Sequence, residues 1–147
     1  MKIHIFNQQK DLPLEKRAVR LLVRSTLAFL GASCEEVTIY FITEKKIADL
    51  HLQFFQDPSP TDCISFPIDS KYLGEVFVCP NVAIRYAKKR KLDPYQETAL
   101  YIIHGLLHLL GYDDLEEALR RTMRKKEKSC MRHLDGLKIT INPKSNS

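Results

Sequence analysis

The sequence of 147 residues has no long hydrophobic run, and this argues against a membrane-spanning helix. Its longest apolar stretch, residues 99–110, is interrupted by two histidines and is shorter than the roughly 18 apolar residues of a membrane span. The first ten residues also lack the apolar segment of a secretory signal, because residues 7–10 are polar. We therefore expect a soluble, cytoplasmic protein with no membrane partner.

Paired cysteines and internal repeats are missing as well. The four cysteines are scattered and form no Cys-x-x-Cys pair, so without a secretory signal we expect reduced thiols rather than disulfides. The length fits one compact domain that can bury a core without a structural metal ion, so a bound metal would serve chemistry. We expect a single domain over residues 1–141 and a frayed polar tail over residues 142–147.

A composition of 44% hydrophobic and 28% charged residues excludes wholesale disorder, and the apolar pattern predicts nine elements. The predicted strands are residues 2–6, 37–42, 63–66 and 75–79, and the predicted helices are residues 14–30, 43–54, 81–90, 94–110 and 114 or 115 to 134. Their order, β-α-β-α-β-β-α-α-α, predicts an α+β fold. We expect a small mixed sheet of about four strands with helices packed against it.

The net charge of +5 is concentrated in two short basic clusters. One cluster spans residues 85–91 and the other residues 120–132, and each alone also fits a solvated helix face. Because both flank the segment richest in histidine, we favour a polyanion partner, namely nucleic acid. The residues that we expect to contact RNA are Lys88, Lys89, Arg90, Arg124 and Lys125.

Two histidines lie four residues apart in the predicted helix 94–110. His104 and His108 therefore share one helix face, at the spacing that lets both imidazoles bind one metal ion. Their neighbours are mostly leucine, and burying two unpaired imidazoles in such a helix is costly. Gly111 ends the helix and permits a reversal that brings Asp114 toward the same point, where a carboxylate is an acceptable third ligand. Asp114 or Asp113 can alternatively cap the next helix.

The two-histidine helix is similar to the zinc-site helix of metalloproteases, but it lacks their general base. In HExxH enzymes a glutamate follows the first histidine, whereas this chain has Gly105 there. A small metallopeptidase is therefore the less favoured alternative. A metal held by three protein ligands keeps a position for water, so hydrolysis of another substrate fits the pattern.

Several segments together resemble one known family. Residues 104–114, HGLLHLLGYDD, closely resemble the HGxLHLxGYDH signature of the YbeY family of bacterial rRNA maturation factors and single-strand endoribonucleases. Residues 60–67, PTDCISFP, are similar to the family's PTDVLSFP segment, and residues 73–76, LGEV, to its LGDI strand. Glu97 lies where the family has a glutamate, and the resemblance runs over residues 50–127.

This resemblance implies a metal-dependent endoribonuclease, with one Zn²⁺ per chain as the expected ion and with His104, His108 and Asp114 as its ligands and catalytic residues. It also implies action on single-stranded RNA, in maturation of the 3′ end of 16S rRNA and in ribosome quality control. The ribosome and ribosomal proteins are then expected partners, and DNA is not.

The chain departs from the family pattern at two positions. Asp114 replaces the family's third metal-binding histidine, and Phe55 replaces an arginine six residues before the threonine of the PTD segment. The second change removes a cation that would face phosphate. In one interpretation, a base stacked on Phe55 compensates for that loss. In the other interpretation, the ring of Phe55 is part of the hydrophobic core. Both departures also fit a non-catalytic ribosome-assembly or RNA-binding factor.

Overall fold

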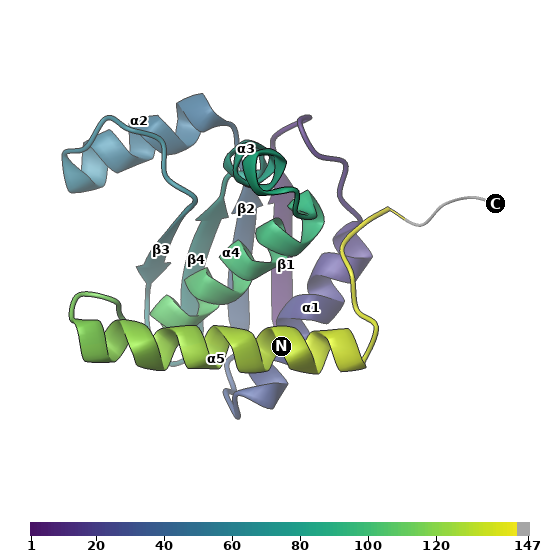
Figure 1. Cartoon of the computed structure of the whole chain (residues 1–147). Helices are drawn as coiled ribbons and strands as arrows, with labels where there is room; N and C mark the ends of the chain where they lie inside the picture. Colours follow the sequence, from purple (N-terminus) through teal and green to yellow (C-terminus); the bar gives the residue numbers. More distant parts are fainter. Residues whose placement is uncertain (144–147) are drawn as a thin grey trace.

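The order of elements in the computed structural model is the predicted one, and the bounds differ by one to three residues at most ends (Figure 1). The structure describes residues 1–143. The strands are β1 (Lys2–Asn7), β2 (Glu36–Phe41), β3 (Cys63–Pro67) and β4 (Tyr72–Val78), and the helices are α1 (Lys16–Phe29), α2 (Glu44–Phe55), α3 (Pro80–Arg90), α4 (Pro94–Leu109) and α5 (Glu117–Gly136). The expected α+β fold is confirmed.

The four strands form one mixed sheet in the order β1-β2-β4-β3. β1 pairs with β2 and β2 with β4 in parallel, whereas β3 pairs antiparallel with β4 and forms an edge of the sheet. The hairpin between β3 and β4 turns at Asp69, whose carboxylate accepts hydrogen bonds from the backbone N–H groups of Lys71 and Tyr72, both at 2.8 Å. This turn lets β4 begin at Tyr72, three residues before the predicted start.

The helices lie mainly over one face of the sheet, and the core lies between them and that face. α1 and α4 pack on the strands, and α5 lies across α1 and α4 as an outer layer (Figure 1). The alternate residues of the strands that point to this side are apolar and buried, as the two-residue period of a strand requires. α2 lies at the end of the sheet beside β3, over a smaller buried cluster. The C-terminal end of α4 and the C-terminal end of α2 thus both come near the edge strand.

The predicted helix starts agree with the structure for two helices, and the predicted start of a third, residue 114 or 115, is two or three residues too early. Thr43 caps α2 by accepting from the N–H of Lys46 at 3.2 Å, and Asp93 caps α4 by accepting from that of Tyr95 at 2.9 Å. α5 begins only at Glu117, because Asp113 instead closes a short turn by accepting from the N–H of Leu115 at 3.1 Å. The carboxylate of Asp114 is therefore not the cap of α5.

No helix within residues 1–143 is long and apolar enough to cross a membrane. The four cysteines are all free thiols. The tail that we predict over residues 142–147 lies outside the described residues from position 144 onward.

Candidate metal centre

The two histidines of α4 face each other at the side of the helix that leaves the core. Nine residues of α4 are buried against the sheet and neighbouring helices, whereas His104 and His108 are only half-buried. One helical turn separates them, and their Nε2 atoms lie 3.1 Å apart. The apolar pattern of the helix therefore fixes both imidazoles on one face.

Asp114 joins this pair from the segment after α4. Gly111 adopts φ +98°, a backbone conformation that favours glycine, and the chain turns back there. The Oδ2 atom of Asp114 then lies 3.9 Å from His104 Nε2 and 4.0 Å from His108 Nε2. Three residues predicted from spacing are thus brought together by the fold.

The three ligand atoms fit a single metal ion. All lie within 4.8 Å of one another, and no other such group is found among the described residues. Zinc bound at about 2.0–2.1 Å in a tetrahedral site sets its ligand atoms about 3.3 Å apart. The observed separations approach that value, and two imidazoles with one carboxylate are an ordinary zinc donor set. Small side-chain movements suffice to close the site.

Glu127 of α5 orients the first of the two imidazoles, and sequence reasoning assigned it no role. The Nδ1–H of His104 donates to Glu127 Oε1 at 3.2 Å, which leaves Nε2 free to face His108 and Asp114. Carboxylates in this position fix the tautomer of a metal-binding histidine. The one signal in the sequence is that Glu127 is the sole acid among the cations of residues 120–132.

The surroundings of His104 shift its pKa upward. Burial by itself lowers the pKa of His104, but the hydrogen bond to Glu127 and the charges of Glu127, Asp62 and Asp114 raise it above the ordinary value. An anionic environment of this kind also attracts a divalent cation to the imidazoles. The electrostatics therefore agree with the geometry.

At Gly105, α4 lies close against the sheet. A Cβ atom there would collide with Val76 Cγ1 of β4, and it would lie 3.2 Å from Ser65 Oγ. The Ser65 hydroxyl donates to the carbonyl of Gly105 at 3.0 Å and ties α4 to β3. A glutamate at position 105 has no room, so the structure gives a physical reason for the missing protease base.

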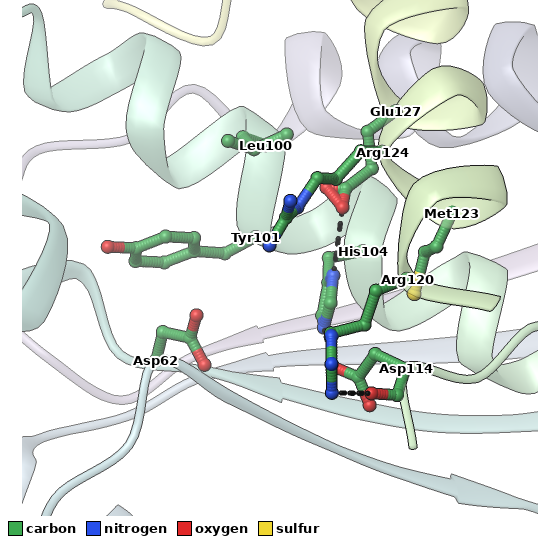
Figure 2. Close-up of a pocket in the computed structure, with 9 residues that line it drawn as sticks. All are labelled: Asp62, Leu100, Tyr101, His104, Asp114, Arg120, Met123, Arg124 and Glu127. Atoms are coloured by element: carbon green, nitrogen blue, oxygen red, sulfur yellow. Dashed lines mark hydrogen bonds and ion pairs between the residues drawn. The ribbon is translucent and has the colours of Figure 1, made fainter. Parts of the chain in front are cut away.

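A charged pocket of about 290 Å³ opens on the α5 side of the histidines (Figure 2). Its wall from α5 carries Arg120, Arg124 and Glu127, and Asp62 lies on the opposite side beside the start of β3. The Arg120 guanidinium donates to the carbonyl of Asp114 at 3.3 Å, which braces the turn that bears the third candidate ligand. Phosphate oxygens of a substrate would meet two guanidinium groups here.

Only one of the five predicted RNA-binding residues lies in this pocket. Arg124 lines it, whereas Lys125 is exposed elsewhere on α5. Lys88, Lys89 and Arg90 are exposed at the end of α3 and line neither pocket beside the histidines. Spacing predicted the clusters but did not resolve which cations face the site, because that depends on helix orientation.

Asp62 and Glu97 hold positions around the site without touching the histidines. Asp62 Oδ1 accepts from the N–H of Cys63 at 2.7 Å, which orders the loop before β3, and its charge contributes to the raised pKa of His104. Glu97 lies two helical turns before His104, where burial raises its pKa, and it is not part of the charged pocket. Asp62 thus both orients its loop and lines the pocket.

A second pocket, of about 420 Å³, lies on the other side of the pair and includes His108. Phe55 lines it, and this residue is 54% exposed. The interpretation of Phe55 as a core residue is therefore wrong, because the last turn of α2 extends beyond the apolar cluster that covers its earlier residues.

Comparisons with known proteins agree on one family. The sequence profile of the family described as Endoribonuclease YbeY matches residues 4–135. The chain is 46% identical over 145 residues to the Endoribonuclease YbeY of Protochlamydia amoebophila, covering 95% of this chain and 97% of that protein. It is 39% identical over 141 residues to the protein of the same name from Chlamydia felis, covering 89% of each.

A solved structure has a similar fold. The solution structure of TM1509 from Thermotoga maritima superposes with a TM-score of 0.68 at 25% sequence identity. The match covers 92% of this chain and 91% of that one.

Proposed function

The chain belongs to the YbeY family of endoribonucleases, hydrolases that act on RNA, and we propose that it cleaves single-stranded RNA with the help of a bound metal ion. We infer that one domain, residues 1–141, carries this activity, with Zn²⁺ as the ion. The family resemblance supports a more specific role in the cytoplasm, where the substrate is the 3′ end of 16S rRNA and the partners are the ribosome and its proteins. RNA rather than DNA is the proposed substrate.

The observation that carries this proposal is the convergence of His104, His108 and Asp114 on one point. His104 Nε2, His108 Nε2 and Asp114 Oδ2 would hold the ion. When bound, the ion would supply a Lewis acid that polarises a phosphodiester oxygen and lowers the pKa of bound water. This donor set keeps one protein ligand anionic where the family pattern has a neutral imidazole.

The chain's own side chains account for orientation and charge around that point. Glu127 holds the proton of His104 on Nδ1, so that Nε2 stays unprotonated toward the ion. Arg120 and Arg124 are the cations among the acids that line this pocket, and their guanidinium groups are suitable partners for the phosphates of an RNA strand. The turn at Gly111 and the contact from Arg120 fix the position of Asp114.

Replacing Asp114 tests the proposal directly. We expect Asp114→Ala to lose most of its zinc affinity and its metal-dependent cleavage, because two histidines alone hold zinc poorly. Asp114→His should retain zinc, and its cleavage should equal or exceed that of the wild type since a neutral ligand leaves the ion more electrophilic. Zinc titration of purified protein and digestion of single-stranded RNA with and without EDTA measure both properties.

Asp113→Ala is the matched control for this experiment. Its carboxylate closes the neighbouring turn through one hydrogen bond from the N–H of Leu115, so its loss should reduce stability by about 1 kcal/mol or less and leave zinc binding intact. Normal zinc affinity in Asp114→Ala would refute the ligand assignment. Zinc binding without any cleavage by the wild type would instead support the non-catalytic RNA-binding factor.

A further inference from the structure

The pocket on the His108 side is lined by two regions that are far apart in sequence. The C-terminal half of α2 forms one wall, and the edge strand β3 with the turn after α4 forms the other. Their side chains combine aromatic surface with hydrogen-bonding groups. The residues that matter here are His51, Phe55, Thr61, Ser65, His108 and Tyr112.

Phe55 offers its ring to this pocket. It is 54% exposed, yet it is held in place by two other rings. Phe66 of β3 lies behind it with a centroid separation of 6.4 Å and an interplanar angle of 26°, and His51 lies 5.7 Å away at a tilt of 53°. His51 is itself fixed, because its Nδ1 hydrogen-bonds with the carbonyl oxygen of Ser59 at 2.8 Å. The ring is thus exposed and positioned at the same time.

We propose that this pocket binds an unpaired nucleobase of the RNA, stacked on Phe55, directly beside the phosphodiester that is cleaved. The inference rests on the proposed function and adds a substrate subsite to it. His108 lines this pocket and His104 lines the charged pocket, while their Nε2 atoms are 3.1 Å apart. A strand whose phosphate lies at the histidines therefore has guanidinium groups on one side and an aromatic ring on the other.

The chemistry of the pocket suits a base better than a phosphate. Its lining has no lysine or arginine, in contrast to the pocket across the histidines. Proteins bind unpaired bases by stacking them on aromatic side chains and by hydrogen-bonding their edges. The hydroxyl group of Tyr112 is one partner for a base edge. The hydroxyl oxygens of Thr61 and Ser65, whose protons are donated to Asp62 Oδ1 and to the Gly105 carbonyl, remain as acceptors. The phenylalanine that takes the place of a family arginine thus keeps a contact with RNA through the base.

The alternative to a nucleobase on this exposed aromatic surface is a protein partner. Leu52, Phe54 and Phe55 of α2 are all more than half exposed, as a docking surface would require. Phe55 differs from the other two because it lines a pocket that contains a candidate metal ligand. A protein partner on this surface would contact Phe54 as much as Phe55, whereas a base in the pocket would contact only Phe55. The effect of replacing Phe54 therefore distinguishes a protein partner from a base.

The experiment compares Phe55→Leu, Phe55→Tyr and the matched control Phe54→Leu. Phe54 is also 54% exposed and is the preceding residue of the same helix, but it packs against Phe66 outside the pocket. Binding to a short single-stranded RNA is measured in EDTA, so that the RNA stays intact. We expect Phe55→Leu to bind about 5- to 100-fold more weakly, Phe55→Tyr to bind as the wild type does, and Phe54→Leu to change little.

A series of RNAs with one abasic position each locates the stacked base. An abasic site at one position should lower the affinity of the wild type for the RNA by a factor similar to that of Phe55→Leu. Combining that RNA with Phe55→Leu should lower the affinity no further than either change alone. With metal restored, that position should keep a fixed offset from the cleaved bond. Equal effects of Phe54→Leu and Phe55→Leu, or affinity that no abasic position changes, would overturn the proposal and favour a protein on α2. Metal-dependent cleavage that persists in that case would leave the proposed function standing.

Discussion

α4 and α5 cross at the candidate metal centre, and they build it in opposite ways. α4 buries nine of its 16 residues and presents its two histidines as polar exceptions on an apolar helix. α5 buries only Met123, Cys130 and Leu134 of its 20 residues, and half of its residues are charged. The two helices meet where Glu127 accepts the hydrogen bond from His104.

This difference distinguishes residues that determine the position of the candidate metal centre from residues that change its charge and hydrogen bonding. Packing against the sheet determines where α4 lies, so most changes in this helix will alter stability together with function. The exposed face of α5 contributes charge and a hydrogen bond with few core contacts, so substitutions there should change metal or RNA binding with little effect on folding. Three experiments examine this contrast.

The largest effect is expected from a glycine of α4. Gly105→Ala places a methyl group against Val76 of β4, and the crowded helix must move away from the sheet. We expect a loss of about 1–3 kcal/mol in the free energy of unfolding. The shift of α4 should also weaken zinc binding, because His104 is the preceding residue. Urea denaturation and zinc titration measure the two losses.

Gly136→Ala in the last turn of α5 is the matched control. Nothing lies within 4 Å of a Cβ atom at this position, and the residue is helical. Alanine should therefore be neutral or should stabilise the protein by up to about 1 kcal/mol. Equal destabilisation by the two substitutions would contradict the contrast between the helices.

An intermediate effect is expected from the carboxylate of α5 that contacts α4. Glu127→Gln keeps the size of the side chain but removes the charge that orients His104, so zinc affinity should fall about 10- to 100-fold. Glu117→Gln, in the exposed first turn of α5, should leave zinc affinity unchanged. Isothermal titration with zinc gives both values, and unaltered affinity in Glu127→Gln would remove this residue from the site.

The smallest effect is expected within α5 itself, from two adjacent cations. Arg124 lines the charged pocket and Lys125 does not. Arg124→Gln should weaken binding of single-stranded RNA severalfold and reduce the salt dependence of the association constant by about 0.7, the slope for one phosphate contact. Lys125→Gln should change both quantities less. Titrations at several salt concentrations compare the two variants. Unchanged affinity and unchanged salt dependence in both would assign both cations to a solvated face.

The sequence by itself determined the order of the elements and the three candidate ligands. Local signals predict the helix: its apolar periodicity, the Asp93-Pro94 start and Gly111 at its end. Within that helix, the four-residue spacing of His104 and His108 places them one turn apart. Asp114 followed from the turn that a glycine allows. These features depend on neighbours within a few residues, where backbone geometry links sequence directly to structure.

Only the tertiary structure decided which distant residues surround those ligands. Glu127 is 23 positions from His104 and reaches it because α5 crosses α4. The orientation of α5 at this crossing also explains why Arg124 lines the charged pocket and Lys125 does not. Phe55 lies in an exposed pocket because α2 ends beside the edge strand. Helix crossing and sheet order arise from packing over the whole chain, and no local pattern in the sequence records them.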